Sequence, residues 1–207
     1  MSISFDVATD MSSSGGGSST HSYSHTCSGS DLILWVAVQT TDNVVSVTYN
    51  SVAMTNAHGT TTVDIYFLVA PTSGSNTVLV TTDGTANIRS SSASYTGASQ
   101  TGQPDGDDFA AGTGDTATGT VTVTATGSWI FMLAENDFGE PTAGTGTTKR
   151  GATGGGAGYG IFDSNGAPGT GSQSLIATAG DGTTSWSLVI ASFDPSPDTA
   201  GGVSWFM

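Results

Sequence analysis

The stretch that decides the fold class is Leu32-Ile33-Leu34-Trp35-Val36-Ala37-Val38, which is apolar at all seven positions. Together with Gln39 it forms a short run that is apolar on both faces of an extended chain, with Ser, Gly and Thr residues on either side. Such a run is typical of a strand at the centre of a sheet that is covered on both faces. The stretch therefore predicts a folded chain with a sheet at its core.

Outward from this stretch the chain alternates polar and apolar residues, and Gly, Ser and Thr interrupt every candidate helix. The alternation predicts about a dozen strands. Their ranges are 2–7, 21–27, 32–39, 44–49, 52–55, 63–69, 76–81, 87–96, 120–125, 128–135, 158–163, 172–178 and 184–193. We expect hairpin turns at Asn50-Ser51, Thr126-Gly127 and Asp181-Gly182.

Two long segments rich in Gly, Gln100–Gly119 and Asp137–Gly156, are predicted to be loops. This pattern predicts an all-β chain, folded as a single β-sandwich of jelly-roll type that spans residues 1–207 as one domain. An apolar strand followed by a hairpin and another apolar strand occurs at Leu32 and again near Trp129. No internal repeat is exact, and this similarity is too loose to establish a duplication.

The charge balance limits the partners of the protein. There are 17 Asp and Glu residues against three Lys and Arg, which gives a net charge of −14. Nucleic acids and anionic lipid surfaces are bound through Lys and Arg, so we expect neither as a partner. The longest apolar run is far shorter than the roughly 20 residues of a membrane-spanning helix. The composition indicates a soluble protein with an acidic surface.

Cys27 is the only cysteine, so the chain has no internal disulfide. Residues 1–19 lack the basic and apolar regions of a secretory signal, and no Asn-x-Ser/Thr acceptor occurs. We expect synthesis in a cytoplasm, with release by lysis or as part of an assembled particle.

Candidate catalytic residues are few. His21 and His25 lie on one face of a predicted strand, too far apart to share a metal ion, and a structural role in the core is expected. The nucleophile elbow G-x-S-x-G is absent, and the two glutamates, Glu135 and Glu140, do not form the paired-carboxylate strand motif of jelly-roll glucanases. The sequence predicts that the protein is not an enzyme, although a Ser-His-Asp triad assembled in space stays open.

Three other groups of residues are candidate binding sites. Asp105, Asp107 and Asp108 alternate with glycine and are candidate calcium ligands, with a solvated acidic loop as the favoured alternative. Tyr159 lies in a Gly-rich segment and is a candidate for stacking on a sugar ring. Trp205, Phe206 and Met207, in the tail that follows Pro195, are costly to expose. They are predicted either to tuck under the sandwich or to form an interface with a neighbouring subunit.

A resemblance to a known family adds to this interpretation. The residues that carry it are His25-Thr26-Cys27-Ser28-Gly29-Ser30-Asp31 with the apolar strand after it, Val44–Thr55 with Tyr49 and Met54, and Val63–Val78 with Pro71 and Gly74. Over about the first hundred residues the chain resembles a β-sandwich domain of tailed-phage virion proteins and bacterial surface proteins. Asn50-Ser51 stands where that pattern usually has Gly-Gly. The resemblance implies a structural, decorating or adhesive role and brings no catalytic residues.

The leading functional prediction is a structural virion protein of a tailed phage, a capsid decoration or a head or tail fibre-type subunit on the virion surface. Such subunits usually form homo-oligomers, often trimers, and contact other virion proteins such as the major capsid protein. The alternative is a carbohydrate-binding or adhesin module that uses Tyr159 and a calcium ion bound by the loop carboxylates. A hydrolase hidden in the sandwich is the third hypothesis. No cofactor is expected beyond that calcium ion.

Overall fold

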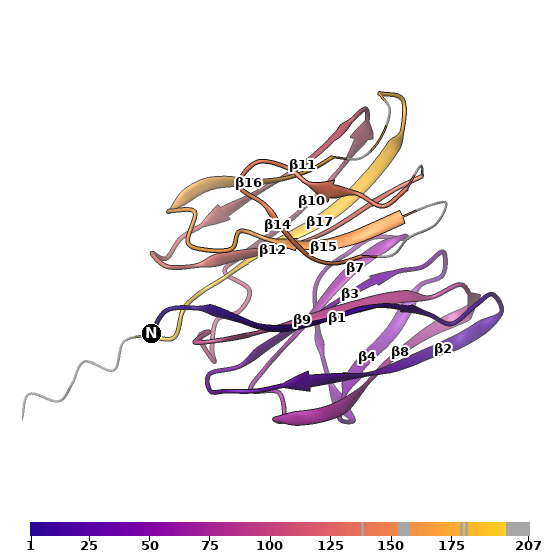
Figure 1. The fold of residues 1–207 in the computed structure, drawn as a ribbon. Helices are drawn as coiled ribbons and strands as arrows, with labels where there is room; N and C mark the ends of the chain where they lie inside the picture. The colour runs from indigo at the N-terminus through magenta and orange to yellow at the C-terminus, as the bar shows by residue number, and fades with distance from the viewer. Residues whose placement is uncertain (138, 153–157, 179, 181, 198–207) are drawn as a thin grey trace, which may run out of the picture.

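The structure is a computed structural model that describes residues 1–137, 139–152, 158–178, 180 and 182–197. The described residues form strands and connecting turns, with no helix. The prediction of an all-β sandwich is confirmed. Figure 1 shows the strands gathered into two bodies, one above the other, with the amino terminus at one end of the junction between them.

The first body, which we call the first sandwich, contains nine strands in two sheets. The strands are β1 (Ser4–Ser13), β2 (Ser18–Cys27), β3 (Ile33–Gln39), β4 (Val44–Tyr49), β5 (Val52–Ala53), β6 (Thr55–Gly59), β7 (Val63–Val69), β8 (Gly74–Ala86) and β9 (Arg89–Thr96). The inner first sheet has the order β1-β9-β3-β7-β6, and the outer first sheet has the order β2-β8-β4-β5.

The second sandwich contains the remaining eight strands. They are β10 (Gly106–Thr113), β11 (Thr116–Val123), β12 (Trp129–Asn136), β13 (Thr142–Ala143), β14 (Thr148–Ala152), β15 (Gly158–Asp163), β16 (Gly171–Thr178) and β17 (Ser185–Phe193). The inner second sheet has the order β10-β17-β12-β15-β14, and the outer second sheet has the order β11-β16-β13.

The four sheets lie in four layers, because a separate apolar cluster fills each of the three spaces between them. One cluster lies between the outer and inner first sheets, and a second lies between the inner and outer second sheets. The largest cluster lies between the two inner sheets and joins the two sandwiches. The sequence patterns had indicated one sandwich of two layers, and the structure has twice that number.

The two sandwiches repeat the same topology. In the first, β1 pairs with β9, β2 with β8 and β3 with β7. In the second, β10 pairs with β17, β11 with β16 and β12 with β15. Across the junction β1 contacts β14, and β10 contacts β6. Since β10 is the equivalent of β1 and β6 is the equivalent of β14, an approximate two-fold rotation that exchanges the two sandwiches relates these two contacts. The loose similarity between Leu32 and Trp129 therefore marks the equivalent strands β3 and β12.

Equivalent residues meet at the centre of the junction. Trp35 of β3 pairs in register with Ala93, and Phe131 of β12 pairs with Ala191, so Trp35 and Phe131 occupy matching positions. Their rings stack with centroids 5.4 Å apart and planes 16° apart. Both side chains are completely buried, as the apolar runs on β3 and β12 predicted. Stacked aromatic side chains bury much apolar area and add a specific geometry to the contact.

The hairpin at Asn50-Ser51 is confirmed, with φ angles of 49° and 63° that suit a two-residue turn. The hairpins predicted at Thr126-Gly127 and Asp181-Gly182 are wrong. The strands on either side of each turn, β11 and β12 in one case and β16 and β17 in the other, lie in different sheets. These turns carry the chain from one layer to the next.

The prediction of two long loops is also wrong. Gln100–Gly119 contains β10 and the start of β11, and the described part of Asp137–Gly156 contains β13 and β14. Glycine weakens a strand by intrinsic propensity, but here it makes room for large side chains, one on the paired strand of the same sheet and one in the next layer. A β-carbon at Gly112 would lie 2.7 Å from the Trp186 ring, and one at Gly119 would lie 2.7 Å from Leu188. Packing against neighbouring strands and sheets therefore outweighs the low intrinsic strand propensity of glycine.

Replacing Trp35 with Ala tests the junction. We expect a loss of about 3–5 kcal/mol in the free energy of unfolding, because the substitution leaves a cavity between the inner sheets. Urea denaturation followed by circular dichroism measures it. The control is Val45→Ala, at a side chain that is 63% exposed, where the change should stay within about 0.5 kcal/mol. Similar losses in both variants would contradict the assignment.

Candidate functional site

The cluster with the most catalytic character surrounds His25 in the core of the first sandwich. His25 is 1% exposed, and its Nδ1 atom lies 2.8 Å from Thr9 Oγ1 and 2.9 Å from Ser92 Oγ. Its Nε2 atom lies 3.1 Å from Ser94 Oγ. Burial lowers the pKa of His25 to about 4, so the imidazole is neutral at pH 7. The predicted structural role of this histidine is confirmed by these hydrogen bonds.

These residues are not arranged as a Ser-His-Asp triad. Asp6, the carboxylate whose charge acts on His25, contacts Ser94 rather than the imidazole, accepting a hydrogen bond from the serine hydroxyl at 2.8 Å. In a triad the carboxylate orients the histidine and the histidine contacts the nucleophile. Ser92 and Ser94 are fully buried. The cluster therefore has neither the order of a triad nor access for a substrate.

The second sandwich has an apolar counterpart of this cluster. Register places Ala117, Gly119 and Val121 of β11 where β2 has His21, Tyr23 and His25. Opposite them, β17 has Leu188 and Ile190 where β9 has Ser90 and Ser92. Large residues face small ones in both cores. In the first sandwich the large residues lie on β2 of the outer sheet, whereas in the second they lie on β17 of the inner sheet. Each core thus still pairs large side chains with small ones, as close packing requires, while its polarity changes.

Asp105 occupies the position that Asp6 has in the first sandwich. Asp6 accepts hydrogen bonds from the backbone N–H and the hydroxyl of Ser28, and from Ser94. Asp105 accepts the same pair from Thr124 and a longer bond, at 3.5 Å, from Ser192. A carboxylate at this position in each sandwich fixes the end of a strand of the outer sheet. Asp105 is a structural residue.

The predicted calcium site at Asp105, Asp107 and Asp108 is therefore wrong. Asp107 Oδ2 lies 2.6 Å from His58 Nδ1, and Asp108 accepts a hydrogen bond from the backbone N–H of Phe109. Asp107 and Asp108 are neighbours in β10 and point to opposite faces, while Asp105 precedes the strand and contacts Thr124, so the three carboxylates do not converge on one ion. Among the described residues no group of three or more His, Cys, Asp or Glu side chains is placed to hold a metal.

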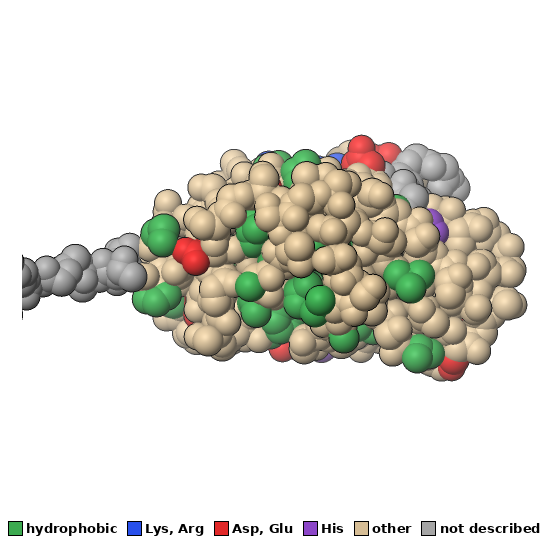
Figure 2. Space-filling model, turned by 90° about the horizontal axis from the view of Figure 1, so that it is seen from below, with side chains coloured by type: hydrophobic (Ala, Val, Ile, Leu, Met, Phe, Trp, Pro, Cys, Tyr) green, Lys and Arg blue, Asp and Glu red, His purple; other side chains and the backbone are tan. Residues whose placement is uncertain are grey.

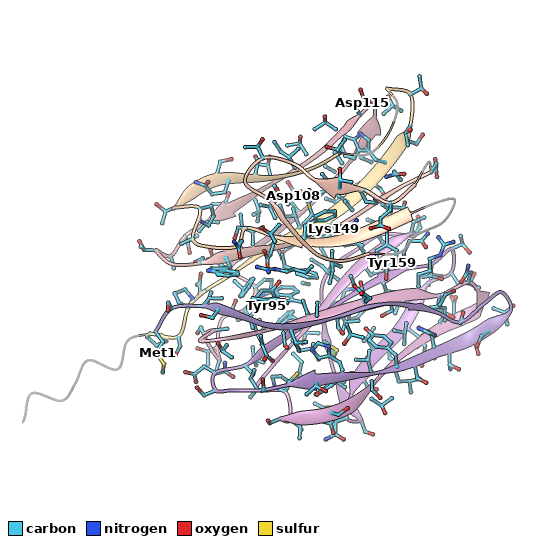
Figure 3. All side chains as sticks on the ribbon, viewed as in Figure 1. Met1, Tyr95, Asp108, Asp115, Lys149 and Tyr159 are labelled. Carbon is cyan, nitrogen blue, oxygen red and sulfur yellow. The ribbon has the colours of Figure 1, made fainter. Side chains whose placement is uncertain are left out.

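Tyr159 cannot stack on a sugar, because it is completely buried between the two inner sheets. Its hydroxyl lies 3.2 Å from Ser91 Oγ of the first sandwich. Figure 3 shows Tyr159 and Tyr95 in the layer between the two bodies. The flanking glycines that suggested exposure are themselves in β15, where Gly158 lies close to the backbone of Gly139. The prediction of a sugar-binding Tyr159 is wrong.

One cluster of polar side chains at the junction was not predicted from the sequence. Asp163 of the second sandwich is completely buried and lies 2.6 Å from Arg150 Nε. Tyr95 of the first sandwich donates a hydrogen bond to the same carboxylate oxygen at 2.9 Å. The Arg150 guanidinium lies 4.0 Å from the centre of the Phe5 ring, also in the first sandwich. The one feature of the sequence that could have indicated this cluster is the scarcity of basic residues, because Arg150 is one of only three Lys and Arg residues.

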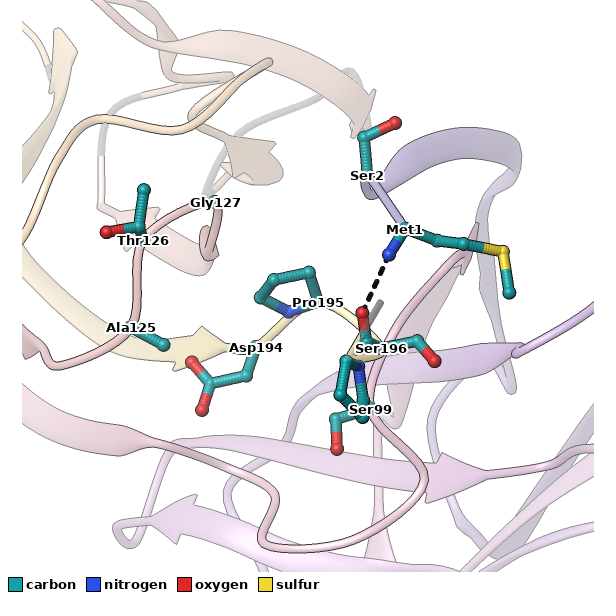
Figure 4. A pocket seen from close by; sticks show the side chains of 10 residues that line it. Met1, Ser2, Ser99, Ala125, Thr126, Gly127, Asp194, Pro195 and Ser196 are labelled. Atoms are coloured by element: carbon teal, nitrogen blue, oxygen red, sulfur yellow. Dashed lines mark hydrogen bonds between the residues drawn. The ribbon is translucent and has the colours of Figure 1, made fainter. Parts of the chain in front are cut away.

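A shallow hollow of about 660 Å³ lies at the end of the junction near the amino terminus (Figure 4). Met1 lines one side, and Ala125, Thr126 and Gly127 from the turn before β12 line the other. Its remaining lining includes the segment Asp194–Pro197, which follows β17. The hollow contains no side-chain pair suited to acid–base chemistry, since Asp194 is its one titratable side chain.

The two outer sheets present hydroxyl groups. Thr116, Thr118, Thr120 and Thr122 alternate along β11 as exposed residues between buried ones. Of the seven strands in the outer sheets, only β8 contains a charged residue, Asp83. Figure 2, which looks onto the outer first sheet, shows a surface with few acidic side chains and separate apolar groups. The charge of −14 is therefore concentrated away from these two faces.

The remaining site prediction, Trp205, Phe206 and Met207, lies outside the described residues. Comparison of the chain with family models, with curated proteins and with solved structures gave no match. No helix of the described residues is long and apolar enough to cross a membrane. The functional argument therefore depends on the geometry of the chain itself.

Asp64 of β7 generates a prediction about pH. Its side chain is buried, and this burial raises its pKa from 3.8 to about 6, with Asn56 and His58 opposing the shift. A raised carboxyl pKa contributes stability below pH 4 that is lost as the pH rises through 6. We expect Asp64→Asn to be more stable than the native protein at pH 8 by on the order of 2 kcal/mol, and equally stable at pH 4. Urea denaturation at both values measures this difference, and a difference independent of pH would contradict it.

Proposed function

We propose that the protein is a structural, non-catalytic subunit on the surface of a tailed-phage particle, a capsid decoration or a head or tail fibre-type protein. The observation that carries the proposal is the position of the reactive side chains. His25, its serine neighbours and Tyr159 are sealed in the cores, and the carboxylates of Asp6, Asp105 and Asp163 hold strands or sheets together. These reactive groups therefore stabilise the fold through packing and internal hydrogen bonds.

The topology supports the finer proposal of a jelly roll. In each sandwich the first strand pairs with the last, and the next pairs are nested inside, so that one long hairpin is rolled into two sheets. Jelly rolls recur in viral capsid and lectin domains, which fits the implied role on a particle, although a fold by itself does not fix a function. Two such units in one chain give a rigid block rather than a flexible arm.

The distribution of charge supports a place within an assembly. Acidic residues keep the subunit soluble before assembly, and the two outer sheets, with Asp83 as the one charged residue on their strands, can meet a neighbour without strong repulsion. We propose that the neighbours are further copies of this chain, as a homo-oligomer, and other virion proteins such as the major capsid protein. On this proposal the protein is made in the host cytoplasm and functions on the virion surface.

The second candidate is a carbohydrate-binding or adhesin module. With Tyr159 buried and the carboxylates diverging, the observation in its favour is now the regular, uncharged array of Thr and Ser hydroxyls on the outer sheets. Such hydroxyls exchange hydrogen bonds with water at little net gain, so each contact contributes little. This candidate therefore requires an extended, repetitive glycan surface.

Immunogold labelling of phage particles tests the proposal. Particles purified by density gradient from lysates of a host that carries the gene should bind the antibody at regular positions. Particles from a strain in which the gene is deleted are the control, and they should stay unlabelled. Detection of the protein only in the soluble fraction, with unlabelled particles, would overturn the proposal. Binding to an isolated host glycan without the particle would favour the second candidate.

A further inference from the structure

The outer second sheet has a strand whose edge is only partly covered. β16 pairs with β11 over its whole length, whereas the short strand β13 pairs only with the last two residues of β16. Just before them, the Gly144 N–H donates a hydrogen bond to Ile176 O, and the Ile176 N–H donates one to Thr147 Oγ1. Among the described residues no strand pairs with this edge of β16 from Gly171 to Leu175.

The register shows which backbone groups this edge presents. In an antiparallel ladder, alternate residues direct both their N–H and their C=O to the same neighbouring strand. Ile176 directs its groups to the β13 side, so Ser174 and Ser172, which are both exposed, direct theirs to the same side. In the first sandwich the equivalent of Ser174 is Thr77, whose carbonyl oxygen accepts a hydrogen bond from the Asn50 N–H at 2.9 Å. The described part of the second sandwich has no counterpart of that bond.

Other edges of the molecule are protected against pairing with a foreign strand. Bulges and charged residues on an edge strand prevent it from adding a strand of another molecule. Among the edge strands of the inner sheets, β1, β6 and β14 each contain a register shift, and β10 contains Asp107 and Asp108. β16 contains no charged residue and no proline, and its register with β11 is unbroken. The open edge of β16 therefore lacks these protective features.

The chain around this edge is uncharged, although the protein has a net charge of −14. No Asp, Glu, Lys or Arg occurs in residues 142–147, which contain β13, or in residues 164–178, which contain β16. β11, on the other side of β16, has no charged residue either. Two acidic chains repel each other where their carboxylates approach, and these segments bring none together. The absence of charge therefore fits a second copy of this chain as the partner.

The open edge is also complementary to itself. A two-fold axis at Gln173 places Ser172 of each copy opposite Ser174 of the other. The N–H and C=O groups of these residues then face each other, so each pair forms both of its backbone hydrogen bonds. The open stretch extends equally on either side of the axis, to Leu175 at one end and at the other to Gly171, where a φ of 90° ends the extended backbone.

We propose that β16 pairs with β16 of a second copy of this chain, antiparallel and centred on Gln173. The two outer second sheets then form one continuous sheet with the order β11-β16-β16-β11, on the outer face of the second sandwich (Figure 1). Because the contact is small, we expect a weak dimer with a dissociation constant on the order of 0.1 mM. The contact specifies the homo-oligomer of the proposed function and rests on that function.

Sedimentation equilibrium of the purified full chain tests the proposal. The native protein should change from monomer to dimer as its concentration rises through about 0.1 mM. Ser174→Pro removes an N–H that has no partner within the described chain, so the fold should tolerate it while the dimer weakens by about tenfold or more. Ser174→Ala keeps this N–H and is the matched control, with dimerisation unchanged. Circular dichroism verifies that both variants are folded.

Amide hydrogen exchange, followed by nuclear magnetic resonance, gives a second measurement that needs no variant. At concentrations that favour the dimer, the amides of Ser172 and Ser174 should exchange more slowly than in dilute solution. The amide of Gln173 already faces β11 and is the internal control, so its exchange should not depend on concentration. This measurement decides the question even if Ser174→Pro fails to fold.

Two results would overturn the proposal. A chain that stays monomeric up to about 1 mM would show that the edge does not pair with itself. A dimer that Ser174→Pro leaves intact, with exchange at Ser172 and Ser174 independent of concentration, would assign the contact to another surface. Both measurements use the purified chain, whereas labelling of particles tests the proposed function, so the failure of one proposal is distinguishable from the failure of the other.

Discussion

The contact on which the rest of the structure depends is the stacking of Trp35 on Phe131, where the two inner sheets meet. An inner sheet is covered on both faces only because the other sandwich lies against it, so β3 is apolar and buried from Ile33 to Val38 and β12 from Trp129 to Ala134. Either sandwich alone would expose a row of aromatic residues to water. The chain therefore resembles a two-fold dimer in which both partners belong to one polypeptide.

This arrangement explains where the polar residues lie. Two buried hydroxyl or carboxyl groups of the second sandwich are paired across the junction, Asp163 with Tyr95 and Tyr159 with Ser91, because leaving them unpaired would be costly. The buried Nε1 of Trp35, by contrast, has no hydrogen-bond partner among the described residues. The cores away from the junction are free to differ: the first contains buried histidine and serine beside its apolar cluster, whereas the second has leucine and isoleucine at the equivalent positions. Residues that suggest chemistry in the sequence thus serve packing, which is consistent with a structural role.

Much of the fold could be predicted from the sequence, because strands with a clear alternation or a continuous apolar run show their burial directly. Val63–Val69 and the hairpin at Asn50-Ser51 are examples. The strands within Gln100–Gly119 could not be predicted, since their glycines are explained only by Trp186 and Leu188 in other strands. The site predictions at Tyr159 and Asp107 were wrong for the same reason. The local sequence shows which residue stands at a position, but not which distant residue will bury its side chain or form a hydrogen bond with it.

The central claim is that the two sandwiches form one cooperative unit through the core between their inner sheets. Differential scanning calorimetry of the full chain tests this most directly. We expect a single transition in which the calorimetric enthalpy equals the van't Hoff enthalpy, because neither sandwich keeps a covered inner sheet without the other. Two separate transitions, each with about half of the total enthalpy, would contradict it.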